Sequence, residues 1–111
     1  GQERGVMPPQ LFVISLGACV AALVTEYCNN HDTDATGLAV DVEFDKAENP
    51  ARLENIRTIV KLPNADVMNK ERALRHVAQH CPVHETIISM SHMDIEIQDR
   101  SILSGEAEPT S

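Results

Sequence analysis

Three cysteines are the residues of this 111-residue chain best suited to covalent chemistry: Cys19, Cys28 and Cys81. A cysteine is nucleophilic as its thiolate, and a helix N-terminus lowers a thiol pKa through unpaired N–H groups and the helix dipole. Pro82 favours the start of a helix, so we expect Cys81 to cap that helix, with His84 able to reach toward the sulfur. Cys81 equally suits a structural reading, as the last apolar residue of the preceding helix.

Cys19 lies inside a long apolar run, where a cysteine commonly serves as a small buried hydrophobe. Its neighbours Gly17 and Ala18 are small, so a second backbone or a slender substrate could approach the sulfur. From these residues alone, both a structural and a redox role remain open for Cys19 and Cys81.

A zinc site is an alternative from another class of chemistry. Cys28 with His31 and Cys81 with His84 form two Cys-x2-His pairs, and zinc readily takes two thiolates and two imidazoles. The long separation between the pairs, and the helical setting expected for Cys28, are unlike compact zinc modules. We therefore expect no metal.

A long helix must position Cys19. Pro8 and Pro9 suit a helix entry, and the helix is predicted from about Gln10 to Asn29. Its side chains are apolar on nearly every side until Glu26, which predicts a central helix enclosed by other elements. Cys19 is expected at its middle.

Three segments alternate between apolar and polar residues, the pattern of strands with one wet face. They are residues 38–44, 56–62 and 93–98, and the first two are expected to pair antiparallel.

An amphipathic helix over about residues 66–80 is expected to pack on this sheet, and a short helix to run from Pro82 through Ile88. The sequence therefore predicts a single α+β domain over residues 1–103. Residues 104–111 are expected to form a disordered tail.

Two motifs in this order resemble the family of osmotically inducible protein C and organic hydroperoxide resistance protein (OsmC/Ohr). Residues 9–19 end in Leu-Gly-Ala-Cys after an apolar run, and His80-Cys81-Pro82-Val83-His84 is similar to the Cys-Pro-Val segment of the family. The resemblance spans about Pro8 to Gln98. It implies a buried central helix and an amphipathic helix on a small antiparallel or mixed sheet, in an intertwined homodimer.

The resemblance also implies a reaction. Cys19 would attack a hydroperoxide oxygen and become a sulfenic acid, Cys81 would resolve it to a disulfide, and a dithiol would reduce the disulfide. No cofactor is implied. Gln10 and His84 are expected as polar neighbours of the thiols.

Two departures from the family pattern bear on activity. Gln10 stands where the family has an acidic residue, and we expect the N-terminal sheet that carries the family's arginine to be missing. A pocket without these charges would leave Cys19 largely in its thiol form. Weak, altered or absent turnover is therefore expected, and a non-catalytic dimer or a small-ligand binding protein is the alternative.

Charge and composition exclude other partners. With 17 acidic against 9 basic residues, the net charge of −8 disfavours nucleic acids. Three cysteines are too few for a disulfide-stapled secreted domain, so a reducing cytoplasmic setting fits best.

The apolar stretch Leu11 to Val24 is shorter than the roughly 20 residues of a membrane span. Residues 16–19 look like a lipoprotein cleavage box, but the apolar run continues past Cys19 where a polar tether is expected.

Overall fold

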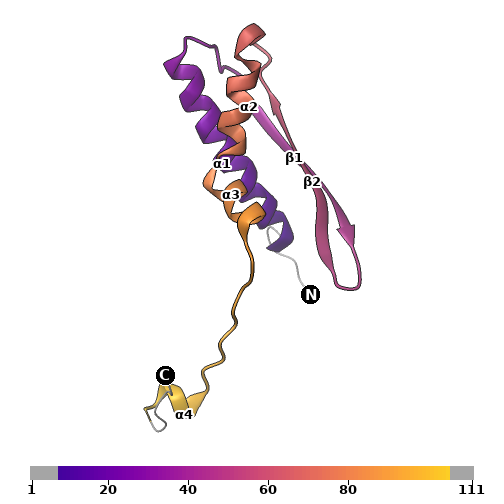
Figure 1. The fold of residues 1–111 in the computed structure, drawn as a ribbon, viewed down its shortest axis with the longest axis vertical. Coiled ribbons are helices and arrows are strands. Elements are labelled where there is room, and N and C mark those ends of the chain that lie inside the picture. Colours follow the sequence, from indigo (N-terminus) through magenta and orange to yellow (C-terminus); the bar gives the residue numbers. More distant parts are fainter. Residues whose placement is uncertain (1–7, 106–111) are drawn as a thin grey trace.

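The computed structural model describes residues 8–105 as a long helix packed beside a two-stranded sheet and two shorter helices (Figure 1). The elements in chain order are α1 (Pro8–Asn30), β1 (Ala39–Ala47), β2 (Arg52–Lys61), the 3-10 turn η1 (Met68–Lys70), α2 (Glu71–Gln79), α3 (Pro82–Ser89) and α4 (Arg100–Leu103). The predicted α+β class is confirmed. The six residues 106–111, most of the predicted tail, lie outside the described part.

One face of α1 forms the core of the molecule. Its buried side chains recur at helical spacing: Val13, Leu16, Val20, Val24 and Cys28. The other face, including Leu11, Phe12 and Ile14, is exposed. The prediction of an enclosed helix is therefore wrong for a single chain, because β1, α2 and α3 together cover only one side of α1.

In the described part of the chain, α1 is the one helix long and apolar enough to cross a membrane, over Pro9–Asn30. The core helix of a soluble protein meets the same criteria of length and composition. The buried face of α1 packs against the sheet and against α2 and α3. This packing favours the interpretation of α1 as a core helix.

One face of the sheet is polar and exposed to solvent, and the other face is apolar and packs toward α1. In the antiparallel register, Val40 lies opposite Val60 on the inner face, and Glu43 lies opposite Arg57 on the outer face. The predicted alternation is confirmed in β1, whereas in β2 Thr58, Ile59 and Val60 are all half-buried. Gly17 allows the close approach of α1 to β1, because an added Cβ would lie 3.3 Å from a methyl carbon of Val42.

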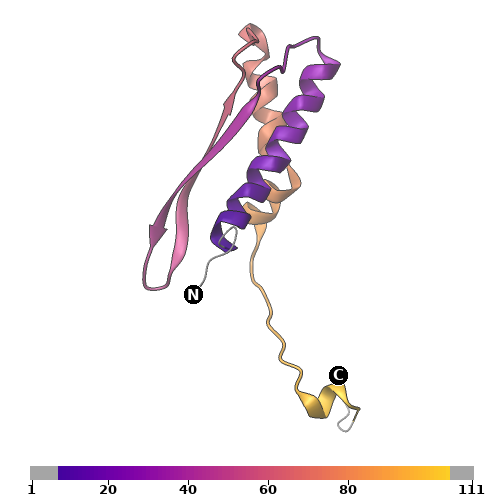
Figure 2. The ribbon, with the colours of Figure 1, turned by 180° about the vertical axis from the view of Figure 1, so that it is seen from behind.

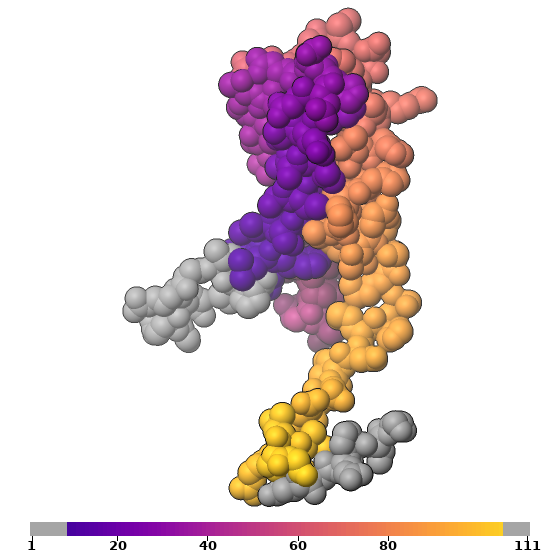
Figure 3. Space-filling view, turned by 90° about the vertical axis from the view of Figure 1, so that its left-hand side faces the viewer, coloured from indigo at the N-terminus to yellow at the C-terminus, as the bar shows by residue number. Residues whose placement is uncertain are grey.

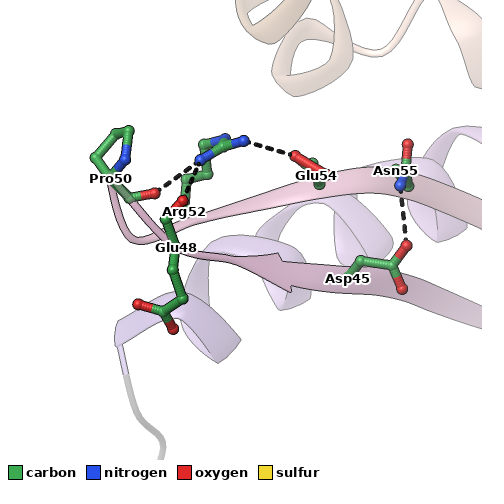
Figure 4. Close-up of polar contacts among 6 residues, drawn as sticks. All are labelled: Asp45, Glu48, Pro50, Arg52, Glu54 and Asn55. Atoms are coloured by element: carbon green, nitrogen blue, oxygen red, sulfur yellow. Dashed lines mark hydrogen bonds and ion pairs between the residues drawn. The ribbon is translucent and has the colours of Figure 1, made fainter.

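The far end of the hairpin is held by the guanidinium of Arg52 (Figure 4). It donates to the carbonyl oxygens of Glu48 at 3.1 Å and Pro50 at 2.8 Å, and it pairs with the carboxylate of Glu54 at 3.1 Å. Asn55 donates to Asp45 of the opposite strand at 2.9 Å. These contacts tie the turn to both strands.

The second predicted helix is shorter than expected and packs elsewhere. The chain first makes the 3-10 turn η1 and then α2, which packs mainly on α1 rather than on the sheet. A cavity of about 610 Å³ separates α2 and α3 from β2. Leu74 of α2 nevertheless joins the same apolar cluster as Val40 and Val60 on the inner face of the sheet.

The chain leaves the body after α3 as an extended segment that ends in α4 (Figures 1 and 2). In the space-filling view, α1 lies beside α2 and α3, and this segment projects from them (Figure 3). The predicted strand over residues 93–98 is extended but pairs with no other segment of residues 8–105. The four-residue helix α4 was not predicted, although Asp99 is a typical cap and accepts hydrogen bonds from the amides of Ser101 and Ile102.

Candidate thiol site

The fold brings Cys19 and Cys81 together from distant parts of the sequence. Cys19 lies in the middle of α1 and Cys81 directly precedes α3, and Cys19 is near enough to raise the pKa of the Cys81 thiol. Both are free thiols packed in one apolar cluster. Cys81 is 0% exposed, whereas Cys19 is partly exposed. A reagent from solvent therefore reaches Cys19 more readily than Cys81.

Cys81 takes the cap position of α3 that the sequence predicts. Its backbone is extended, with φ −72° and ψ 142°, and Pro82 opens the helix. The sulfur accepts a hydrogen bond from the backbone N–H of His84 at 3.2 Å. The contact expected from the His84 ring is therefore supplied by the His84 amide. The backbone N–H groups in the first turn of a helix have no partner within the helix, so one of them can donate to the sulfur of the cap residue.

Burial controls the protonation of Cys81. Removal from water raises the pKa of its thiol, the His84 amide lowers it, and the hydrogen bond and charge of Cys19 raise it again. The net direction is upward, so the expected lowering of the Cys81 pKa by the helix N-terminus is wrong. Desolvation of the thiolate outweighs the amide, and Cys81 keeps its proton at neutral pH.

The third cysteine, Cys28, sits in the same core but in a different setting. Burial raises the pKa of its thiol, and the positive charge of Lys70 opposes this in part. The ammonium of Lys70 donates to the carbonyl oxygen of His31 at 2.7 Å and to the hydroxyl of Thr33 at 2.9 Å. Lys70 thus ties the end of α1 to the start of α2, a link that the sequence reading missed because no local spacing signals it.

We expect the folded protein to lose stability in alkaline solution. Cys28 and Cys81 ionise at higher pH when folded than the ordinary thiol value of 9.0, so above that value the unfolded chain loses protons that the folded chain retains. The free energy of unfolding should therefore be constant up to about pH 8 and fall as the pH rises further. Urea denaturation across this range checks it.

Cys28→Ala provides the comparison for this experiment. It lowers stability at every pH by leaving a cavity, but the decline above pH 9 should become shallower because one buried thiol is gone. Parallel curves for the two proteins would contradict the assignment of the decline to buried thiols.

The four ligands of the alternative zinc site do not converge. In residues 8–105, no three His, Cys, Asp or Glu side chains are grouped in a way that could hold a metal ion. The exposed ring of His31 instead stacks on Tyr27 and bonds to the carbonyl oxygen of Tyr27 at 2.9 Å. The geometry therefore gives the zinc alternative no support.

Gln10 lies apart from the thiol pair. It occupies the first turn of α1, and nine residues of helix place it roughly 13 Å from Cys19 along the axis. This is beyond hydrogen-bond reach of the sulfur. The supporting role expected for Gln10 stays a prediction.

His84 joins the thiol pair to the 610 Å³ cavity. Its ring lines the cavity, and its buried Nδ1 atom has no hydrogen-bond partner among the described residues. The cavity lies between α1, β2, α2 and α3, with mainly aliphatic walls that include Leu16 and Val20, and with Glu71 and Arg75 among its polar members. Neither Cys19 nor Cys81 is a lining residue, so the hollow borders the thiol pair rather than containing it.

Comparisons with known proteins agree with this fold. Residues 1–98 match the family model of OsmC-like proteins. No curated protein sequence shows a significant match to the chain. Several solved structures do resemble it.

Three of these structures illustrate the similarity. A Psychrobacter arcticus protein whose given name refers to osmotic stress induction and a detoxification response has 19% identity and a TM-score of 0.70, over 78% of this chain and 63% of its own. An OsmC-like protein of Mycoplasma pneumoniae has 21% identity and a TM-score of 0.65, and the match covers 79% of this chain and 66% of that protein. An OsmC-like hydroperoxide resistance protein of a Jannaschia species has 17% identity and a TM-score of 0.68, and the match covers 89% of this chain and 73% of that protein.

At these identities the structures establish a shared fold. The present chain spans about 63% of the length of the Psychrobacter protein. Their activities are properties of those proteins, and what this chain does must be argued from its own residues.

Proposed function

Since this chain belongs to the OsmC-like protein family, we propose that it is a thiol-dependent reductase of organic or inorganic hydroperoxides, acting through Cys19 and Cys81. The observation that carries the proposal is the proximity of the two thiols, which pack in one apolar cluster, close enough for Cys19 to raise the pKa of the Cys81 thiol. Two neighbouring thiols can form a disulfide, and its formation supplies the two electrons that reduction of a peroxide requires.

Cys19 is the residue that meets the hydroperoxide, because it is the more exposed of the pair. Its thiolate attacks one peroxide oxygen, the O–O bond breaks, and the departing alkoxide takes a proton and leaves as an alcohol. Cys19 becomes a sulfenic acid. The sulfur of Cys81 then attacks the sulfur of Cys19, and the hydroxyl group leaves as water with the proton that Cys81 held.

A dithiol reductant completes the cycle. One of its thiolates attacks the disulfide to form a mixed disulfide, its second thiol closes to an intramolecular disulfide, and Cys19 and Cys81 regain their protons. This cycle needs a reducing compartment, so we propose a cytoplasmic setting. The aliphatic walls of the neighbouring cavity favour hydroperoxides with an apolar group.

The neutral Gln10 at the family's acidic position favours a second candidate, a non-catalytic member that binds a small apolar ligand. The 610 Å³ cavity is within the range of small-molecule sites. Such a protein would leave hydroperoxide unconsumed while its thiols remain reduced. The two candidates therefore differ in the fate of the thiols.

Treatment of the reduced protein with one equivalent of tert-butyl hydroperoxide tests the proposal. Peptide mass spectrometry should find a disulfide between Cys19 and Cys81, because these two thiols pack in the same cluster. In Cys81→Ser the sulfenic acid has no resolving partner, so Cys19 should accumulate as sulfinic acid in excess peroxide. Cys28→Ala is the matched control and should form the same disulfide as the wild type.

Two results would contradict the proposal. Thiols that stay reduced while the peroxide persists would favour the ligand-binding candidate. A disulfide that contains Cys28 instead of Cys19 would show that the assigned pair is not the reactive one.

A further inference from the structure

The two thiols lie at different depths, one behind the other. Cys81 is 0% exposed and belongs to the buried core cluster, whereas Cys19 is partly exposed and packs against that cluster. The helices that position them, α1 and α3, lie side by side (Figures 1 and 3). Cys81 is therefore on the core side of Cys19, and solvent is on the other side.

This difference in depth favours displacement reactions at the sulfur of Cys19. A thiolate displaces another sulfur in line, so the attacking and departing sulfurs lie on opposite sides of the sulfur under attack. When Cys19 holds a small thiol in a mixed disulfide, that thiol lies on the solvent side and Cys81 lies opposite. Cys81 can then attack from the core while the small thiol departs into solvent.

The backbone of α3 supplies a hydrogen bond for this attack. Burial raises the pKa of the Cys81 thiol, so its thiolate must be stabilised as the proton leaves. The backbone N–H of His84 donates to Sγ of Cys81 at 3.2 Å and opposes this rise of the pKa in part. A hydrogen bond to a charged acceptor is stronger than one to a neutral acceptor. The contact that caps α3 thus also favours the attacking form of Cys81.

The third cysteine is separated from this exchange by its position. Cys28 is 0% exposed and lies nine residues beyond Cys19 on α1, which is roughly 13 Å along the helix axis. Burial raises the pKa of its thiol, and the reactive form of a cysteine is the thiolate. A reagent in solvent therefore meets Cys19 first, and Cys81 is the neighbour that can complete the reaction.

We propose that the reduced chain also reduces small disulfides, a second class of substrate beside hydroperoxides, and that Cys19 alone forms the mixed disulfide. The thiolate of Cys19 attacks one sulfur of the small disulfide, and its S–S bond breaks. The first small thiol leaves, taking a proton from solvent in exchange for the one that Cys19 released. Sγ of Cys81 then attacks Sγ of Cys19, the mixed disulfide breaks, and the second small thiol leaves with the proton that Cys81 held.

This activity rests on the thiol pair of the proposed function, but it needs neither a hydroperoxide nor a sulfenic acid. Two protein thiols become a disulfide while one small disulfide becomes two thiols, and the dithiol of the proposed cycle regenerates the protein. The net charge of −8 repels anionic reagents, so neutral and cationic disulfides are the favoured substrates. A chain that exchanges with a small disulfide but leaves hydroperoxide unconsumed would refute the peroxidase proposal and retain this one.

Release of thione from 2,2′-dithiodipyridine, a neutral disulfide whose product absorbs in the near ultraviolet, tests the proposal by stopped-flow absorbance. The wild type should release two thiones per chain. The first release should be proportional to the probe concentration, and the second independent of it, because Cys81 attacks within the chain. Cys81→Ser should release one thione. Cys19→Ser should react at least about 100-fold more slowly, because buried thiols react only when the fold opens locally.

Cys28→Ala is the matched control and should release two thiones in the same two phases as the wild type. Three results would overturn the proposal. A Cys19→Ser protein as reactive as the wild type would show that a buried thiol is open to solvent. Two thiones from Cys81→Ser would assign the second step to Cys28. A wild type that stops after one thione would show that Cys81 does not reach Cys19.

Mass spectrometry of the wild type carries the test if a serine variant fails to fold by circular dichroism. In samples quenched with acid during the first phase, peptide fragmentation should locate the pyridylthio group on Cys19. In samples quenched after the second phase, it should find a disulfide between Cys19 and Cys81. A pyridylthio group on Cys81 or Cys28 in the early samples would contradict the assignment of Cys19 as the residue that exchanges with solvent.

Discussion

Cys19→Ser is expected to lower the rate of organic hydroperoxide consumption, measured with a dithiol reductant in excess, by about 100-fold or more. A serine hydroxyl ionises far less readily than a thiol and cannot store the oxidising equivalent as a sulfenic acid. Serine has nearly the shape of cysteine, and Cys19 is only partly buried in α1, so the fold should persist. Circular dichroism and thermal unfolding would confirm this.

The matched control for this prediction is Cys28→Ala, which removes the cysteine that takes no part in the proposed cycle. Its rate per folded molecule should stay within about twofold of the wild type. Equal rates for Cys19→Ser and the wild type would exclude Cys19 as the nucleophile. The ligand-binding candidate would then be the better account of the fold.

Leu16→Ala is expected to produce the largest loss of stability among simple truncations of α1. Leu16 is 3% exposed and packs in the core cluster with Val20 and Leu74. Truncation of a buried leucine costs about 2–5 kcal/mol through lost burial and the cavity left behind. Against a typical total of about 5–15 kcal/mol, this is a large fraction of the free energy of unfolding. Urea denaturation followed by circular dichroism measures it.

Leu11→Ala tests the same residue type on the same helix but on the opposite face. Leu11 is 55% exposed, so its truncation should change the free energy of unfolding by no more than about 0.5 kcal/mol. A loss as large as that of Leu16→Ala would show that the exposed face of α1 is covered in solution. The description of this face of α1 as exposed to solvent would then be wrong.

The sequence predicts the local elements of this protein well. Pro8 and Pro82 mark the starts of α1 and α3, and the alternation of Val40 and Val42 with acidic residues identifies β1. These signals are local, because they depend on backbone restriction and on side-chain periodicity. The same kind of signal at Asp99 would have revealed α4.

The positions of those elements relative to one another could not be predicted from periodicity. The apolar stripe of α2 could have faced the sheet or a helix, and it packs mainly on α1. The alternation at Ile95 predicted a strand, but the described chain forms none there, because pairing requires an edge that periodicity does not specify. Tertiary packing decided both cases.

The resemblance to the family predicted that Cys19 and Cys81 form the candidate site. The direction in which the pKa of Cys81 shifts could be found only from the structure. The cap position of Cys81 followed from Pro82, and this part is confirmed. The direction of the Cys81 pKa did not follow, because burial in the cluster outweighs the helix N-terminus. The degree to which a thiol is desolvated depends on residues distant in sequence, such as Cys19.

The placement of the two thiols on α1 and at the start of α3 has a consequence for tolerance of heat. Both strands and α2 lie in the stretch of chain between Cys19 and Cys81. A covalent link there would close a ring around most of the fold, and the chain-entropy model assigns such a ring about 4 kcal/mol of added stability. The oxidised molecule would thus outlast the reduced one at elevated temperature.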